Sequence, residues 1–156
     1  MKEMILQTRI NVCSYDELSG ADKAVVDAAR AATANSYAVY SNFSVGAAVL
    51  LGNGTVVSGS NQENAAYPSG LCAERTTLFW ANSQYPKEPV EVLAIAAKNV
   101  QGELEFPITP CGACRQVMAQ YQLKSGLPMR VLLVGAHKIW RFEKVDDLLP
   151  LIFDSI

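Results

Sequence analysis

Four cysteines are the residues of this sequence best suited to chemistry, and three of them fall in two short motifs. Cys72 opens the triplet Cys-Ala-Glu, which ends at Glu74, and Cys111 and Cys114 enclose two residues directly after Pro110. Two cysteines separated by two residues are typical of a metal site or a redox pair. Because residues three apart lie on one face of a helix, both thiolates of the pair can bind one ion.

Both motifs fall where a helix is expected to begin, and the positive end of the helix dipole stabilises thiolates. We therefore predict that Cys72, Cys111 and Cys114 bind one zinc ion per chain. Three protein ligands leave a fourth position for water, as in catalytic zinc sites, whereas a closed structural site needs a fourth ligand. Cys13 and His137 lack motif spacing, so we expect an ordinary buried or half-buried thiol at the first position and a surface imidazole at the second.

Glu74 follows the first predicted ligand by two residues, close enough to exchange a proton with water at the metal. Zinc and three thiolates sum to a charge of −1, which weakens the metal as a Lewis acid. Arg75 is the candidate to donate hydrogen bonds to the thiolates and withdraw that charge. Nucleobase deaminases combine such a zinc site with a glutamate of this kind. A zinc-stabilised binding module without catalysis is the alternative, and it leaves Glu74 unexplained.

The remaining pattern predicts the elements that position these motifs. Asn53-Gly54 indicates a hairpin, and the short link before residue 138 requires an antiparallel pair. The order favours an α/β fold, a three-layer α/β/α arrangement with a five-stranded mixed sheet, in a single domain covering residues 1–156. The predicted helices cover residues 21–32, 72–83 and 111–122, with a short one at 146–149, and the predicted strands cover residues 45–51, 55–58, 92–97, 131–134 and 138–142.

Composition narrows the class of protein. The 156 residues are 50% apolar, enough for one core, and carry a net charge of −2. A protein that follows a nucleic-acid backbone usually has a basic surplus, so we expect no nucleic-acid partner. No apolar run reaches the length of a membrane span. The apolar stretch at the start of the sequence is too short for a signal peptide. We therefore expect a cytoplasmic protein with no membrane partner.

Beyond the cysteine motifs, three further segments carry a family resemblance. The sequence resembles the small homotetrameric zinc-dependent cytidine deaminases over nearly its whole length. The segments that carry this resemblance are Cys72 to Thr76 and Pro110 to Gln116 at the two zinc motifs, Tyr40 to Ala48 at the first predicted strand, Asn61 to Tyr67 after the second, and Leu148 to Phe153 at the C-terminus.

The resemblance implies hydrolytic deamination of cytidine and deoxycytidine to uridine and deoxyuridine, with release of ammonia, in pyrimidine salvage. It implies that Asn61 and Glu63 bind a ribose hydroxyl, that Phe43 lines the pyrimidine pocket and that the Ala73 backbone binds the base edge. Phe153 would cover the base in a neighbouring subunit of a homotetramer with shared active sites.

Each of these assignments has a simpler alternative. Without the resemblance, Phe43 is a core residue, Asn61 a turn residue and Glu63 a solvated loop charge. A tail around Phe153 that folds back on its own core is likewise the simpler interpretation. Another deaminase of the same fold, acting on a nucleoside antibiotic or a nucleotide, is the nearest alternative function. A panel of substrates distinguishes it from a cytidine deaminase.

Overall fold

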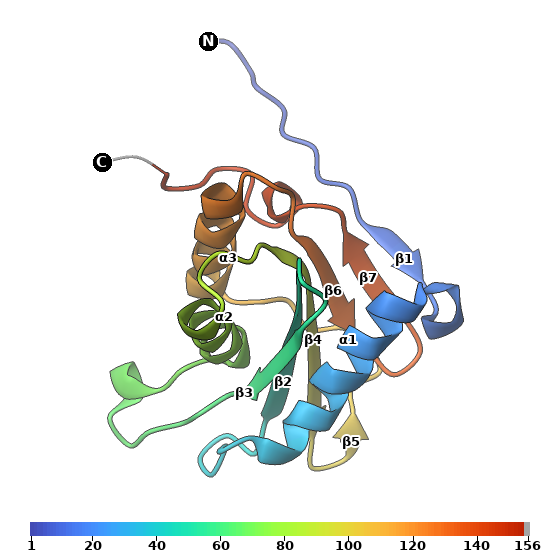
Figure 1. The fold of residues 1–156 in the computed structure, drawn as a ribbon, viewed down its shortest axis with the longest axis vertical. Helices are drawn as coiled ribbons and strands as arrows, with labels where there is room; N and C mark the ends of the chain where they lie inside the picture. The colour runs from blue at the N-terminus through green and yellow to red at the C-terminus, as the bar shows by residue number, and fades with distance from the viewer. Residues whose placement is uncertain (155–156) are drawn as a thin grey trace.

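The computed structural model describes residues 1–154 and shows a single mixed sheet with helices on both faces (Figure 1). Within these residues the strand order is β1-β7-β6-β4-β2-β3, and β5 pairs with β4 outside this path. The helices are α1 (Gly20–Ala32), α2 (Ala73–Gln84) and α3 (Gly112–Ser125), and the strands are β1 (Asn11–Cys13), β2 (Ser44–Leu51), β3 (Val56–Ser60), β4 (Val90–Asn99), β5 (Gly102–Glu103), β6 (Arg130–Val134) and β7 (Ile139–Phe142).

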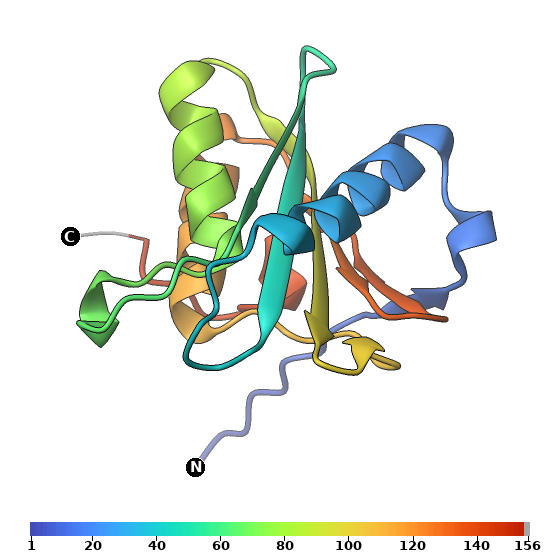
Figure 2. The same ribbon diagram turned by 90° about the horizontal axis from the view of Figure 1, so that it is seen from below.

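The predicted α/β fold with three layers is confirmed. Seen along the sheet, α1 covers one face, while α2 and α3 lie together on the other (Figure 2). The predicted hairpin between β2 and β3 and the antiparallel pair of β6 and β7 are both present. β4 and β6 run parallel, with α3 in the connection between them. In place of the expected short helix at residues 146–149 there is a 3-10 turn at Val145–Asp147.

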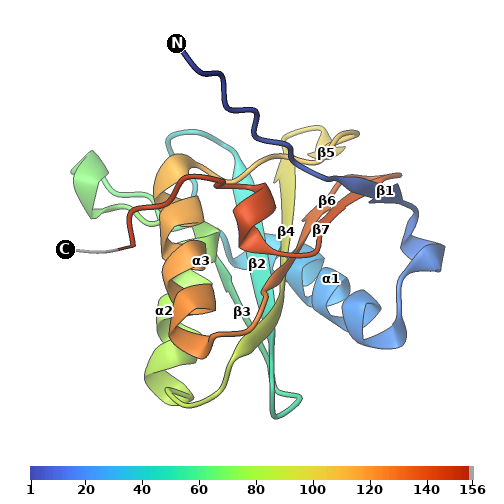
Figure 3. The ribbon, with the colours of Figure 1, turned by 90° about the horizontal axis from the view of Figure 1, so that it is seen from above.

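The prediction of five strands was too low, because the sheet has seven strands within residues 1–154. The two missed strands, β1 and β5, have three and two residues. Strands this short carry no readable alternation of apolar and polar residues. β1 exists through long-range pairing with β7, where Asn11 lies opposite Arg141 and Cys13 opposite Ile139. Residues before β1 extend away from the sheet (Figure 3).

Each face of the sheet has its own buried cluster. The α1 face buries Val25, Val26 and Ala29 against β2, β4 and β6. The backbones of α1 and β2 lie in close contact here, and only glycine fits at position 46, since a Cβ on Gly46 would lie 2.1 Å from the Ala29 carbonyl oxygen. On the other face, α2 and α3 cover a larger cluster that includes Cys114. None of the helices described is long and apolar enough to cross a membrane.

Candidate active site

Three cysteine sulfurs meet where α2 and α3 begin. Cys72 is the N-cap residue of α2, Cys111 is the N-cap residue of α3, and Cys114 lies one turn into α3. The Sγ atoms of Cys72 and Cys111 are 3.9 Å apart, and those of Cys111 and Cys114 are 3.4 Å apart. All three sulfurs lie within 4.8 Å of one another, so the predicted convergence of these cysteines is confirmed.

The cluster has the spacing that zinc requires. Tetrahedral ligands at the usual zinc–sulfur distance of about 2.3 Å stand roughly 3.8 Å apart, close to the distances found here. Among the described residues, the cluster contains these three potential ligands and no fourth. His137 is exposed, and Cys13 is half-buried with its thiol 3.8 Å from the Ile139 carbonyl oxygen. The donor set therefore fits one zinc ion with a coordination position left for water.

The ionisation of the thiols also fits a metal site. A hydrogen bond from Cys114, with a smaller contribution from Arg75, lowers the pKa of Cys72 to about 5. The same hydrogen bond to Cys72, followed by burial, raises the pKa of Cys114. The two thiols thus hold one proton between them. A divalent cation displaces such a proton, because metal binding requires every cysteine ligand as a thiolate.

Arg75 contacts the cluster from the first turn of α2. Its Nη2 atom donates to the Cys72 sulfur over 3.7 Å, and this interaction raises the pKa of the guanidinium. Its Nε atom is buried and has no hydrogen-bond partner in the part of the chain that the structure describes. Arg75 is therefore placed to withdraw negative charge from a thiolate, the position that sequence analysis expected.

Glu74 lies in the first turn of α2, interacts with Cys72 and Cys114, and is only 4% exposed. Burial, with a further contribution from the negative charge of Cys72, raises the pKa of this carboxyl. A carboxyl with a raised pKa gives up and regains a proton nearer neutral pH than an exposed one. The position and surroundings of Glu74 thus suit a group that transfers protons.

A pocket of about 550 Å³ lies in front of Cys72. It brings together four of the predicted site residues: Asn61, Glu63, Cys72 and Arg75. Sequence analysis assigned no role to three other lining residues, Tyr40, Tyr67 and Leu71. The pocket is lined by Tyr40, Ser41, Asn61, Gln62, Glu63, Asn64, Tyr67, Gly70, Leu71, Cys72 and Arg75.

The aromatic walls of this pocket come from two loops. The rings of Tyr40 and Tyr67 meet edge to face, with centroids 6.4 Å apart and an interplanar angle of 72°. Leu71 contributes an exposed apolar side chain beside them. Both tyrosines lie in segments that carried the family resemblance, and an aromatic residue in such a segment was the signal available for finding them.

Glu63 fixes one loop of the pocket. Its Oε2 atom accepts hydrogen bonds from the backbone amides of Tyr40 at 2.8 Å and Ser41 at 3.3 Å. A hydrogen bond from the Ser41 hydroxyl, together with these amides, lowers the pKa of the carboxyl. Glu63 is therefore an anchored carboxylate in the pocket wall, rather than a freely solvated loop charge.

Asn61 is held by residues at and before the start of β2. Its Oδ1 atom accepts from Ser36 Oγ at 2.5 Å and from the Val45 amide at 2.8 Å. Its Nδ2 atom donates to the Phe43 carbonyl oxygen at 2.9 Å. A carboxamide nitrogen carries two hydrogens, so one donor remains for a ligand in the pocket.

Three predicted substrate contacts do not line this pocket. Ala73 is fully buried under the cluster, and Phe43 is half-buried against the core of the same face. Phe153 is 67% exposed, on the tail that follows the Val145–Asp147 turn. Within a single chain, the structure therefore does not bring Phe153 to the pocket.

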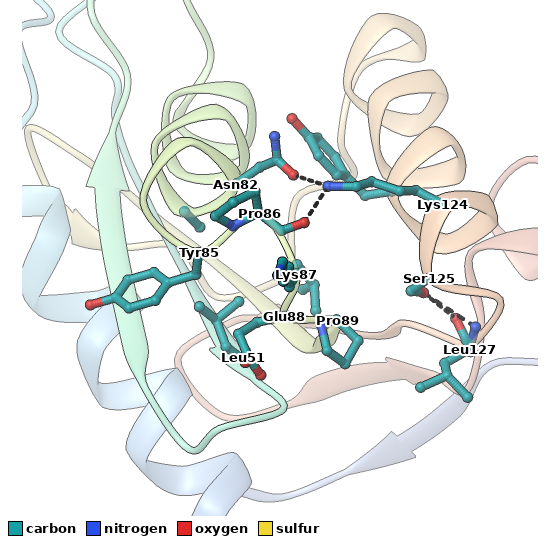
Figure 4. Close-up of a pocket in the computed structure, with 13 residues that line it drawn as sticks. Leu51, Asn82, Tyr85, Pro86, Lys87, Glu88, Pro89, Lys124, Ser125 and Leu127 are labelled. Carbon is teal, nitrogen blue, oxygen red and sulfur yellow. Dashed lines mark hydrogen bonds between the residues drawn. The ribbon is translucent and has the colours of Figure 1, made fainter.

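A second hollow, of about 410 Å³, lies at the opposite ends of the same two helices (Figure 4). There Lys124 extends from the last turn of α3 and donates to Asn82 Oδ1 and, over 2.7 Å, to the Pro86 carbonyl oxygen. A cation at a helix C-terminus interacts favourably with the helix dipole and with free carbonyls. These contacts join the C-terminal ends of α2 and α3, far along both helices from the cysteines.

Comparison with known proteins agrees with this site. Residues 19–127 match the family model for the cytidine and deoxycytidylate deaminase zinc-binding region. A cytidine deaminase from Mycobacterium tuberculosis is 39% identical over 119 residues, which are 76% of this chain and 79% of that protein. A cytidine deaminase from Halalkalibacterium halodurans is 46% identical over 85 residues, 54% of this chain and 60% of that protein.

Solved structures show the same relationship. The crystal structure of cytidine deaminase from Burkholderia pseudomallei superposes with a TM-score of 0.70 at 39% identity, covering 83% of this chain and 97% of that one. By sequence, the chain spans about 60% of the length of the first curated relatives it matches. The chain belongs to the cytidine and deoxycytidylate deaminase family and contains its zinc-binding region.

Proposed function

We propose that this protein is a zinc-dependent cytidine deaminase that converts cytidine and deoxycytidine to uridine and deoxyuridine and releases ammonia. The observation that carries the proposal is the buried carboxyl of Glu74 next to three converging cysteines, one of which, Cys72, lines a pocket that also contains Asn61 and Glu63. Membership of the family supports the same activity.

In this mechanism the substrate's cytosine ring lies toward Cys72, with its sugar near Asn61 and Glu63. Cys72, Cys111 and Cys114 would hold the zinc ion, which when bound would supply a water-derived nucleophile at neutral pH. Glu74 accepts the proton of the attacking water and delivers it to N3 of the ring as the C4–O bond forms. It then carries the proton of the new C4 hydroxyl to the amino nitrogen, so that the C4–N bond breaks, ammonia leaves and the C4 carbonyl of uracil forms.

The pocket walls favour a free nucleoside over a polynucleotide. The Glu63 carboxylate can accept a hydrogen bond from a sugar hydroxyl and repels a phosphate attached at the same oxygen. The net charge of −2 provides no general attraction for nucleic acid. We therefore expect cytidine and deoxycytidine to be good substrates, and oligonucleotides with internal cytosines to be poor ones.

Ultraviolet absorbance tests the activity directly, since conversion of cytidine to uridine changes the spectrum. Zinc-loaded protein is incubated with cytidine, deoxycytidine, a cytidine nucleotide, blasticidin S and a cytosine-containing oligonucleotide. Turnover of the two nucleosides supports the proposal. Turnover of only the antibiotic or the nucleotide would replace it with a related deaminase. No turnover of any compound by a zinc-loaded protein would favour a binding module.

We also propose that the active sites are shared within a homotetramer, with Phe153 covering the base in a neighbouring subunit. The ring is 67% exposed and lies outside its own chain's pocket, so it is accessible for contact with a second subunit. An aromatic ring stacked on the base would add affinity and exclude water from the reaction.

Mixed oligomers test this arrangement. Glu74→Gln chains lack the proton carrier but keep Phe153, while Phe153→Ala chains keep Glu74 but lack the ring. Co-expressed subunits should recover activity beyond the sum of the two separate variants, because one chain's ring can cover another chain's functional site. If mixed oligomers form and only the summed activity is found, each site is built from one chain.

A further inference from the structure

The C-terminal tail is fastened to α3 by side chains of that helix. Arg115 donates through Nη1 to the Leu148 carbonyl oxygen at 2.9 Å, and through Nε to the Pro110 carbonyl oxygen at 2.9 Å. The next residue, Gln116, bonds both backbone groups of Phe153. Its Nε2 atom donates to the Phe153 carbonyl oxygen at 2.7 Å, and its Oε1 atom accepts from the Phe153 amide at 3.3 Å.

This pairing fixes the direction of the Phe153 side chain. Ile152 packs against the core cluster beneath α3, whereas Leu151 and Phe153 are 69% and 67% exposed. Alternation of buried and exposed side chains is the pattern of an extended chain lying on a surface. Gln116 holds this register as a neighbouring strand would, with one donor and one acceptor for the same residue.

The same helix begins with two of the three zinc-binding cysteines. Cys111 and Cys114 lie five and two residues before Gln116, so the tail is attached within about two turns of the metal ligands. A ring positioned from this helix keeps a fixed relation to the N-terminal end of α3. An unattached chain terminus usually frays instead.

We propose that Gln116 is a positioning residue that sets the location of Phe153 and thereby tunes substrate binding. The inference rests on the proposed role of Phe153 as a cover over a neighbour's base. Gln116 itself does not touch the substrate in this arrangement. It acts through the tail, and its loss should raise KM while leaving zinc content and kcat nearly unchanged.

Gln116→Met tests this proposal in the zinc-loaded oligomer, because methionine keeps the length of the side chain and removes both hydrogen bonds. Gln120→Met is the matched control, since Gln120 is an exposed residue one turn further along α3 and, within the described part of the chain, makes no hydrogen bond to residues 148–153. We expect KM to rise roughly five- to tenfold for Gln116→Met, the factor expected for one or two net hydrogen bonds. The control should stay within about twofold of wild type.

Two further measurements separate this proposal from the proposed function. Amide hydrogen exchange of residues 148–154 should speed up in Gln116→Met, whatever the tail does for the substrate. Combining Gln116→Met with Phe153→Ala should raise KM no further than Phe153→Ala alone. Unchanged hydrogen exchange of the tail would show that the hydrogen bonds of Gln116 do not hold it in place. Faster exchange with unchanged KM would show that Gln116 holds the tail without affecting substrate binding. Additive effects on KM in the double variant would show that Gln116 does not act through Phe153. Unchanged KM in Phe153→Ala alone would instead overturn the proposed cover.

Discussion

Within residues 1–154, each face of the sheet buries one carboxyl group, and the surroundings of the two groups differ. On the α1 face, Asp22 is 1% exposed and forms ion pairs with Arg130 at 2.8 Å and Arg141 at 3.6 Å. On the α2–α3 face, Glu74 is 4% exposed and lies among thiols, with Arg75 directed to a sulfur rather than to the carboxylate.

This difference indicates a structural role for Asp22 and a chemical role for Glu74. Two guanidinium groups, from β6 and β7, compensate the charge of Asp22 and join α1 to these two strands. Glu74 has no ion pair among residues 1–154, and its raised pKa shows that the surroundings favour its protonated form. A buried carboxyl kept without a compensating cation is a marker of function, because it costs stability. We expect substitutions on the two faces to affect different measurements.

The largest effect is expected from Cys111→Ala. With two thiolates left, the site should lose most of its zinc and activity should fall below detection. The measurements are metal analysis of the purified protein and turnover of cytidine. Hydrogen exchange should rise at the starts of α2 and α3, while α1 stays protected, because α1 packs on the other face. A fully active protein without zinc would refute the metal site.

Glu74→Gln should have the next largest effect. The amide keeps the shape of the side chain but cannot take a proton, so kcat should fall by roughly 10²–10⁴-fold, the usual contribution of a positioned acid–base group. Zinc content should not change, and the free energy of unfolding should stay equal or rise, since a buried ionisable group is removed. Near-normal kcat would show that another group moves the protons.

Asp22→Asn should show the reverse pattern. Removing the charge leaves Arg130 and Arg141 without their buried partner, so unfolding in urea should show a loss of about 1–3 kcal/mol. Turnover at moderate temperature should stay close to wild type. Asp27→Asn, an exposed position on the same helix, is the control and should change stability little. A fall in kcat without loss of stability would contradict the separation of the two faces.

The contrast between the faces also shows which parts of the molecule were predictable from the sequence. Cys72, Cys111 and Cys114 were found because metal ligands need particular residue types at local spacings, and Pro110 marked a helix start. The buried pair of Asp22 and Arg130 was not found, because 108 residues separate its members and only the fold brings them together.

The contact of Gln116 with the tail and the aromatic residues of the pocket were missed for a similar reason. Gln116 is an ordinary polar helix residue in sequence, and its contact with Phe153 exists only once the tail has folded over α3. Tyr67 lies on a loop, in a 3-10 turn at Tyr67–Ser69, where no periodic pattern indicates that its ring lines a pocket. Local chemistry was therefore readable, whereas contacts made by long-range packing required the structure.

The smallest effect is expected from Glu63→Gln, at the open side of the pocket. Glutamine can still accept from the Tyr40 and Ser41 amides, but its other terminal group is then a donor rather than an acceptor. A hydrogen bond from a sugar hydroxyl to the carboxylate would be lost, and KM should rise about tenfold with little change in kcat. Rejection of a nucleoside carrying a phosphate on that hydroxyl should weaken, because the repelling charge is gone.

The pH dependence of KM supplies the final check on Glu63. Hydrogen bonds from Ser41 and Tyr40 place the pKa of this carboxyl below its ordinary value of 4.5. A group with a depressed pKa keeps its charge, and the binding that depends on it, until the pH falls through the folded-state pKa. The ratio of KM between Glu63→Gln and wild type should therefore be constant from about pH 8 to about pH 5, because any titration of Glu74 affects both proteins alike. A ratio that shrinks as the pH falls through about 6 would mean that Glu63 becomes protonated there, which would contradict its role as an anchored carboxylate.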